Sequence, residues 1–367
     1  MRHRWVSENT ALERGVDEMK HPQFAQLDSI RFVSSTLKRL NHSETPALES
    51  LTIGKNGIEK PLELENPFIV PPYITRNLDG DLFTGISLGS CLSGINMNLH
   101  GKMSKDQKEI HKIHSPPVLY DLCTCRKVPD ASLLMMSDCL WLELGPPEGD
   151  TGRNSSKEWG EYPELEGSKD LIHFVSMLKE TRDIPIIISI RAIDLVNDVD
   201  NVLVTEADAI HIRCGFDDDD HNGPSFFGFT GEPVTTAIQM VEHMDIFKSR
   251  EKGVKFLLSG PFRNAADIIK LAALGVDGFG IDSLLRRKIL PNENTVERKL
   301  DWASIGETVQ ISIKSLRDEI ISYLDTLNLK SLEQLDRSML VVDSYHTAAL
   351  TGLPLAGYGR EIPFWRH

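Results

Sequence analysis

The sequence of 367 residues has no run of about 18 consecutive apolar residues, which a membrane-spanning helix would require. Its first thirty residues carry several charges and no apolar segment of signal-peptide length. It also has no excess of positive charge, since the formal net charge is −14. Nucleic acid and anionic lipid both attract positive surfaces, so neither is an expected partner. We predict a cytoplasmic protein without nucleic-acid or membrane partners.

Cysteine is scarce and irregularly spaced. Five cysteines occur in the chain, with one C-x-C pair at 123 and 125 and no C-x-x-C motif. This number and spacing disfavour a disulfide scaffold and a four-cysteine metal site, and buried structural thiols are the favoured interpretation. P-loop, G-x-S-x-G and H-E-x-x-H motifs are absent as well. We assign no residue as a metal ligand.

What the chain does contain is a series of short apolar runs that alternate with segments of helical period. Hydrophobic residues make up 40% of the chain, enough to bury a core. Most of the eight runs are bounded by Gly, Pro or Asp, and they fall at residues 67–70, 95–98, 118–122, 139–144, 184–190, 207–212, 254–259 and 276–281. Alternation of strands and helices predicts parallel pairing with crossover helices, and eight strands favour a closed (β/α)8 TIM barrel over an open doubly wound sheet.

The predicted barrel occupies residues 61–300, with an N-terminal extension over 1–60 and C-terminal helices and a tail over 301–367. The extension contains one predicted helix within residues 27–40. A long amphipathic pattern over 304–329 and a shorter one over 331–340 predict two helices that pack on the outside of the barrel.

The loops after the seventh and eighth predicted strands form a candidate phosphate rim. In a barrel of this type, phosphate groups commonly lie between these two loops. Gly260 allows close backbone approach and Arg263 offers a fork of donors, while Gly280, Ile281 and Ser283 lead into a helix whose N-terminus favours anions. The alternative is that the glycines serve turns and that the arginine forms a surface ion pair.

The same stretch resembles the FMN-binding barrel of glutamate synthase. The shared order is a strand, an S-G-x-x-R loop, a helix with D-x-x-K-x-x-A-L-G, and a strand ending in GFG. Weaker similarities, in the same order as in the family, extend over residues 24–343 and include LGSCLSGINMNLHGKMS at 88 and LELGPPEGDTGR at 142. The resemblance implies FMN, with its phosphate on Gly260, Arg263, Gly280, Ile281 and Ser283.

On the ring side, the resemblance places the isoalloxazine against Pro72 and Tyr73. The family has a lysine at the end of the fifth strand that stabilises negative charge on the reduced ring, and this sequence has Ser189 there. Arg191 lies two residues further on the same face and is the predicted replacement. Lys102, after the second strand, is a second candidate for contact with an anionic ligand.

Two further departures from the family pattern affect the expected chemistry. The family ligates an iron–sulfur cluster through three cysteines after the eighth strand, and residues 284–300 contain none, so we predict no iron–sulfur cluster. After the sixth strand, a Gly-rich family segment is replaced by four consecutive aspartates, Asp217 to Asp220, followed by His221. This run is either a solvated loop or a site for a divalent cation.

The resemblance implies an FMN-dependent oxidoreductase of divergent glutamate synthase type, acting on an amino or imino acid or a related small anion. In this prediction Arg191 and Lys102 are the catalytic candidates. Implied partners are a small anionic substrate and a separate glutaminase or electron-donor subunit, and a homo-oligomer remains open. The alternative is a flavin-free barrel that acts as a regulatory or binding subunit or that holds another phosphorylated ligand.

Overall fold

The structure is a computed structural model that describes residues 25–33, 45–55, 58–76, 78, 80–101, 103–122, 131–144, 168–216, 229–289 and 301–358. Its centre is an eight-stranded parallel sheet in the order β4-β13-β12-β9-β8-β7-β6-β5. The strands are β4 (Phe68–Ile69), β5 (Met97–Leu99), β6 (Val118–Asp121), β7 (Cys139–Glu143), β8 (Ile186–Arg191), β9 (Ala209–Arg213), β12 (Lys255–Ser259) and β13 (Gly278–Gly280). Each lies within or overlaps one of the eight apolar runs, which confirms the predicted (β/α)8 barrel.

Closure of the barrel between β4 and β5 relies largely on side chains, with one backbone hydrogen bond, from the Glu65 N–H to the Gly94 carbonyl at 3.0 Å, just before the two strands. No backbone ladder joins these two strands among the described residues. Instead, Asn96 accepts a hydrogen bond from the Val70 N–H at 2.9 Å and donates one to the Val70 carbonyl at 3.0 Å. The side-chain amide therefore satisfies a backbone donor and acceptor that a neighbouring strand would otherwise satisfy.

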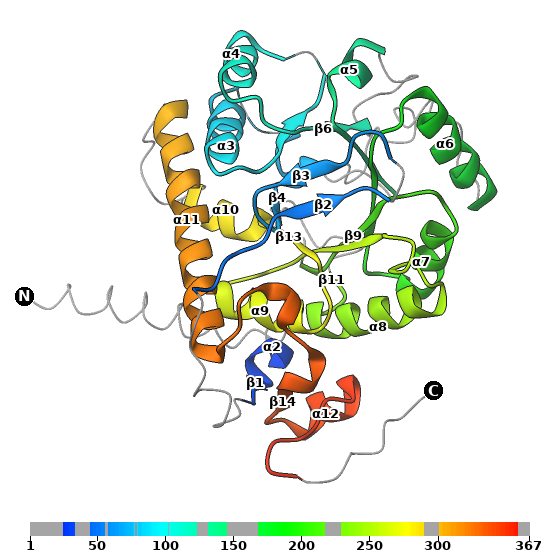
Figure 1. The fold of residues 1–367 in the computed structure, drawn as a ribbon, viewed down its shortest axis with the longest axis vertical. Helices are drawn as coiled ribbons and strands as arrows, with labels where there is room; N and C mark the ends of the chain where they lie inside the picture. The colour runs from blue at the N-terminus through cyan, green and yellow to red at the C-terminus, as the bar shows by residue number, and fades with distance from the viewer. Residues whose placement is uncertain are drawn as a thin grey trace, which may run out of the picture.

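Helices surround the sheet (Figure 1). They are α3 (Gly80–Leu92), α4 (Lys105–His114), α5 (Ala131–Met136), α6 (Ser168–Thr181), α7 (Leu195–Leu203), α8 (Pro233–Ile246), α9 (Ala265–Ala273), α10 (Asp282–Ile289) and α11 (Trp302–Leu327). The predicted long C-terminal helix is α11, which packs along α3. At this contact Gly85 and Gly89 allow close approach, because a Cβ on either would lie within 2.6 Å of the side chain of Ile305 or Val309.

The two ends of the described chain meet outside the barrel. Helix α2 (Ala25–Ser29) leads into β1 (Ile30–Phe32), which pairs antiparallel with β14 (Leu340–Val342), and α12 (Tyr345–Thr351) follows. The prediction of one helix within 27–40 was therefore wrong for residues 30–32, which form a strand because Ile30 is buried opposite Val342. The second predicted C-terminal helix is replaced by two 3-10 turns, Leu332–Gln334 and Arg337–Met339.

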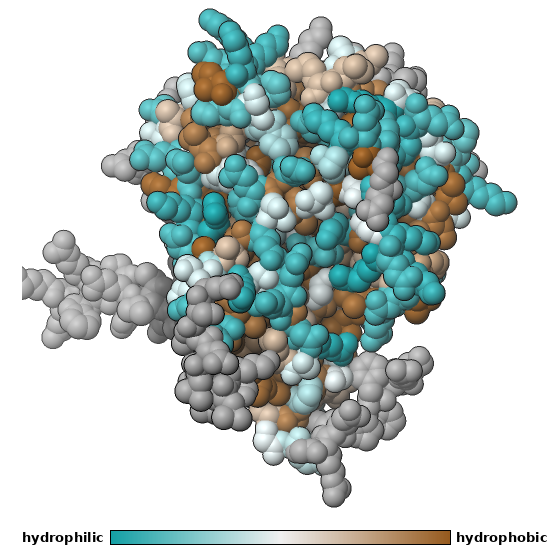
Figure 2. Space-filling model, in the orientation of Figure 1, coloured by the Kyte–Doolittle hydropathy of each residue, from teal (hydrophilic) through white to brown (hydrophobic). Residues whose placement is uncertain are grey.

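A hairpin of β2 (Leu51–Ile53) and β3 (Leu62–Leu64) lies across the end of the barrel at which the strands begin. Figure 2 shows this face, where hydrophilic side chains predominate and hydrophobic ones are scattered. The short strands β10 (Gly215–Phe216) and β11 (Phe229–Thr230) form a second pair after β9. None of the described helices combines the length and apolar character needed to cross a bilayer.

Candidate functional site

Buried polar side chains gather where the barrel strands end, which is the end that carries active sites in this architecture. At the centre is His211 on β9, whose ring nitrogens contact two serine hydroxyls. Nδ1 lies 2.8 Å from Ser189 Oγ and Nε2 lies 2.7 Å from Ser259 Oγ. All three residues are almost fully buried, and burial lowers the pKa of His211 to about 3. The imidazole is therefore neutral near pH 7 and links the fifth, sixth and seventh strands.

Aromatic rings and a guanidinium lie next to this histidine. The rings of Trp141 and Tyr73 lie 4.7 Å and 6.2 Å from the His211 ring, and the Arg213 guanidinium lies 4.3 Å from the centre of the Tyr73 ring. A cation over an aromatic face at this distance is attracted by the ring quadrupole. Tyr73, Trp141, His211 and Arg213 are referred to below as the central cluster.

Two buried donors of the central cluster differ in their surroundings. Trp141 Nε1 makes no hydrogen bond within the described part of the chain. Tyr73 Oη is also buried and makes no well-formed hydrogen bond, but the Ser259 hydroxyl and the Asp282 carboxylate lie beside it. Burial raises the pKa of Tyr73 well above its ordinary value, and the Asp282 carboxylate adds to the shift, so the phenol is protonated and able to donate. A buried donor without a partner is uncommon, and Trp141 Nε1 points to a missing acceptor such as a ligand atom or water.

A second set of charged groups lies where the first four barrel strands end. Arg76 donates to both oxygens of Asp121, at 2.6 and 3.0 Å, and lies 2.6 Å from Glu143. His100 Nδ1 lies 3.1 Å from the same Asp121 carboxylate. Desolvation would raise the pKa of Asp121, but the hydrogen bonds from His100 and Arg76 outweigh it and hold the pKa below its ordinary value. Asp121 is therefore ionised at neutral pH.

A chain of hydrogen bonds connects this charged set to the turn that carries Tyr73. His100 Nε2 lies 2.6 Å from Thr75 Oγ1, which also accepts from Asn98 at 3.1 Å and donates to the Pro72 carbonyl at 3.0 Å. Asn98 in turn accepts from Asn96, the residue that closes the barrel. The polar network thus runs continuously from the barrel seam to the buried carboxylates.

The predicted phosphate rim is assembled at the ends of β12 and β13. These strands pair in parallel with Ser259 opposite Gly280, and Ser283 donates to the Gly260 carbonyl at 2.7 Å. The structure therefore brings together Gly260, Gly280, Ile281 and Ser283. The inner side of Gly280 is occupied, because a Cβ there would lie 1.7 Å from Ser259 Oγ.

Arg263 is directed elsewhere. Its guanidinium contacts both oxygens of Asp267 at 3.0 and 2.9 Å, and it contacts Asp28 of α2 at 2.7 Å. Its backbone N–H also donates to Asp267. An anion that recruited Arg263 would have to compete with two carboxylates.

The remaining predicted residues lie as follows. Pro72 and Tyr73 form the 3-10 turn Pro72–Ile74 directly after β4. Ser189 belongs to the hydrogen bonds around His211, and Arg191 ends β8 opposite Arg213 of β9. Lys102 and the run Asp217 to Asp220 with His221 lie outside the described residues. Among the residues that the structure describes, no three His, Cys, Asp or Glu side chains are arranged to hold a metal ion.

Sequence analysis overlooked most of the charged and aromatic groups at this end of the barrel. The overlooked residues are Arg76, Asp121, Trp141, Glu143, His211 and Arg213. A usable signal exists for several of them, because a polar residue within or at the end of an otherwise apolar strand must be paired when it is buried. Asp121 ends β6, Glu143 ends β7, and His211 interrupts the apolar strand β9.

Comparisons with known proteins agree with this architecture. The family model described as the conserved region in glutamate synthase matches residues 160–285, about a third of the chain. The resemblance expected from the motifs is therefore confirmed over that segment. No curated protein matches the chain.

Among solved structures, a single-substitution mutant of flavocytochrome b2 with benzoylformate is similar, with 16% identity, a TM-score of 0.57, and coverage of 94% of this chain and 84% of that one. A mutant of (S)-mandelate dehydrogenase has 15% identity and a TM-score of 0.53, and the match covers 88% of this chain and 93% of that one. A mandelate oxidase mutant with a monooxide FMN adduct has 12% identity and a TM-score of 0.51, and the match covers 84% of this chain and 87% of that one. At these identities the similarity establishes a shared barrel fold.

Proposed function

We propose that the chain is an FMN-dependent oxidoreductase barrel, divergent from glutamate synthase, that acts on a small organic acid. The observation that carries the proposal is the central cluster, where Arg213 lies over Tyr73 and the buried Trp141 Nε1 lacks an acceptor among the described residues. The glutamate synthase match over 160–285 and the FMN adduct named for one structural neighbour support the same class of cofactor.

The central cluster suits the ring system of FMN. A flavin ring has carbonyl and ring-nitrogen acceptors. The Tyr73 hydroxyl and the Trp141 indole N–H would be able to donate hydrogen bonds to them. Arg213 would stabilise negative charge on the reduced ring, a role for which sequence analysis proposed Arg191. Pro72 and Tyr73 remain the predicted ring contacts.

The phosphate side fits less well. Gly260, Gly280, Ile281 and Ser283 lie together, but Ser283 already donates to the Gly260 carbonyl, and Arg263 is held by Asp267 and Asp28. A phosphate at this rim would therefore depend on backbone N–H groups in the first turn of α10 more than on Arg263.

FMN, when bound, would supply a two-electron acceptor that takes two electrons and one proton, the equivalent of a hydride, from the substrate. The protein's own contribution is positional. Asp121 and Glu143 hold Arg76 in place through ion pairs, Arg213 attracts an anionic group to the mouth of the barrel, and the neutral His211 fixes the strands beneath. The names of the structural neighbours favour a 2-hydroxy acid as substrate, whereas the glutamate synthase match favours an amino or imino acid.

A flavin-free barrel is the second candidate, and Arg263 favours it specifically. A guanidinium that pairs with two carboxylates is unsuited to a phosphate without rearrangement. In this alternative the chain retains the fold and acts as a regulatory or binding subunit, or holds a different phosphorylated ligand.

Flavin titration of the purified protein separates the two candidates. We expect FMN absorption in the isolated protein, or saturable quenching of FMN fluorescence on titration. The variant Arg213→Ala should bind FMN at least about tenfold more weakly, equivalent to about 1.4 kcal/mol. Arg263→Ala is the matched control and should leave the affinity within about threefold. Colourless protein that does not bind added FMN would refute the flavin proposal and leave the binding-subunit alternative.

Turnover with 2-hydroxy acids and with amino acids, followed by flavin bleaching without oxygen, then identifies the substrate class. A separate glutaminase or electron-donor subunit, a homo-oligomer and a cytoplasmic location stay predictions at this stage.

A further inference from the structure

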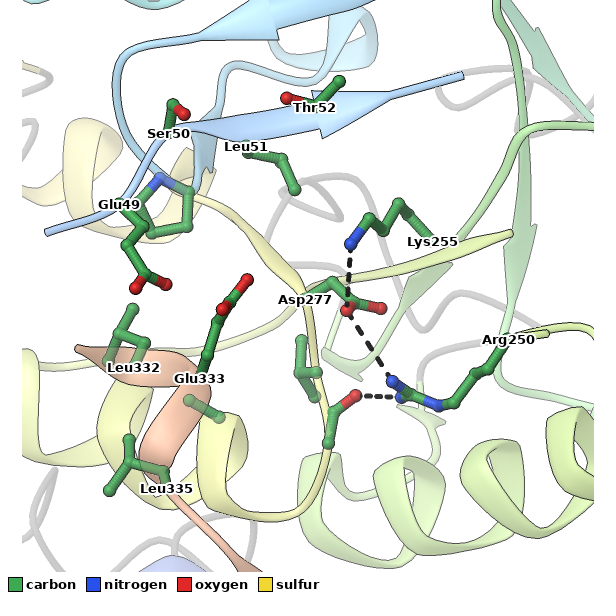
Figure 3. Close-up of a pocket in the computed structure, with 14 residues that line it drawn as sticks. Glu49, Ser50, Leu51, Thr52, Arg250, Lys255, Asp277, Leu332, Glu333 and Leu335 are labelled. Carbon is green, nitrogen blue, oxygen red and sulfur yellow. Dashed lines mark hydrogen bonds and ion pairs between the residues drawn. The ribbon is translucent and has the colours of Figure 1, made fainter. Parts of the chain in front are cut away.

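A cavity of about 300 Å³ lies at the end of the barrel opposite the central cluster. Its walls come from the starts of β12 and β13, from β2, and from the turn Leu332–Gln334. The volume is at the lower end of the range for pockets that hold small molecules. Figure 3 shows that charged side chains of opposite sign occupy different sides of this cavity.

The positive side has more cations than anions. Arg250 and Lys255 share one oxygen of Asp277, at 3.6 and 3.8 Å, distances that are too long for good hydrogen bonds. The other Asp277 oxygen accepts from the backbone N–H of Phe256. One carboxylate thus faces two cations, and a second anionic group can be accommodated at this side.

The opposite side carries two carboxylates. Glu49 precedes β2 and Glu333 lies in the turn Leu332–Gln334, and both line the cavity. Neither side chain has a hydrogen-bond or ion-pair partner in the part of the chain that the structure describes. Their charges are therefore available to a cation that enters the cavity.

Apolar side chains also contribute to the walls of the cavity, although polar atoms make up more of the lining than apolar ones. The apolar side chains belong to Leu51, Leu332 and Leu335 together with Pro67, Ala272 and Val276. They offer contact to methylene groups of a ligand.

We propose that this cavity binds a small dipolar molecule, one whose ammonium group and carboxylate are separated by an apolar spacer. The carboxylate contacts Lys255 and Arg250, the ammonium group contacts Glu49 and Glu333, and the spacer lies on the leucines. This site is separate from the proposed flavin site, so either proposal can fail without the other.

Isothermal titration with three probes of equal spacer length tests the proposal. The probes are 6-aminohexanoate, which carries both charges, and hexanoate and hexylamine, which carry one each. We expect 6-aminohexanoate to bind at least about tenfold more tightly than either of the others, because only it contacts both sides. Absence of binding by 6-aminohexanoate, or equal affinity for hexanoate, would overturn the proposal.

Substitutions then assign the contacts. The double variant Glu49→Gln/Glu333→Gln should reduce affinity for 6-aminohexanoate to that of hexanoate, and Lys255→Met should reduce it to that of hexylamine. Glu319→Gln, on the exposed face of α11, is the control and should bind like the unaltered protein. Because Lys255 begins β12 and its replacement can disturb folding, the glutamate variant decides, and unchanged binding in that variant would contradict the assignment.

Discussion

The buried ion pairs of Arg76 provide the sharpest test of the electrostatics at the barrel mouth. Arg76 contacts Asp121 and Glu143, whose side chains are 0% and 6% exposed. Replacing one partner of a buried pair typically costs about 3–5 kcal/mol, because the other charge stays buried without compensation. We therefore expect Arg76→Leu to lower the free energy of unfolding by about 3–5 kcal/mol at pH 7, measured by urea denaturation.

The loss of unfolding free energy in Arg76→Leu should decrease as the pH falls. In the unaltered protein the pKa of Asp121 is held below its ordinary value, which is near 3.9 for a free aspartate. The contribution of Asp121 to stability is therefore present above that ordinary pKa and is lost as the pH falls through the lowered pKa of the folded state. In Arg76→Leu the Asp121 carboxylate stays buried and keeps its hydrogen bond from His100 but loses both contributions of Arg76, so we expect its pKa to rise and protonation to relieve the penalty as the pH falls. The difference between the two proteins should therefore shrink from pH 7 to pH 5.

The matched control is the exposed ion pair between Arg31 and Asp343, at 2.8 Å, with side chains 54% and 47% exposed. Arg31→Leu should cost less than about 1 kcal/mol, since solvent screens such pairs. The reasoning is refuted if Arg76→Leu costs no more than Arg31→Leu, or if its cost is the same at both pH values.

Three smaller changes test other contacts. Asn96→Ala should lower the free energy of unfolding by about 2–4 kcal/mol, because the backbone donor and acceptor of Val70 both lose their partner. Hydrogen exchange at the Val70 amide should accelerate, while amides of β9 keep their protection. Gly280→Ala should cost about 1–3 kcal/mol in thermal unfolding through its clash with Ser259, and an unchanged melting temperature would contradict this packing. Asp28→Ala should lower the free energy of unfolding by no more than about 1 kcal/mol, since the Asp28 side chain is half-exposed and Asp267 still holds the Arg263 guanidinium. A larger loss in urea denaturation would mean that α2 is held mainly through this contact.

The barrel was predictable because its determinants are local. Most strands are apolar runs bounded by residues that end regular structure, and α11 shows its period over many turns. The short strand β1 was not predictable, because its partner β14 lies about three hundred residues away, and Ile30 alone does not distinguish a strand from a helix.

The site was predictable only in part, for a similar reason. The chain order places Gly260 and Gly280 at neighbouring strand ends, and the structure brings them together. The direction of the Arg263 side chain depends on Asp28, 235 positions away, which no local pattern reveals. His211 and Asp121 carry a sequence signal, since each is a polar residue within or at the end of an apolar strand, but their partners can be identified only after folding.

The pairing of β1 with β14 limits how the chain can be shortened. A fragment that begins at the first barrel strand would leave Leu340–Val342 with one edge uncovered, and uncovered edges of this kind recruit the same segment from other molecules. Any shortened form prepared for crystallisation should therefore keep residues 25–33 together with 340–342, or remove both.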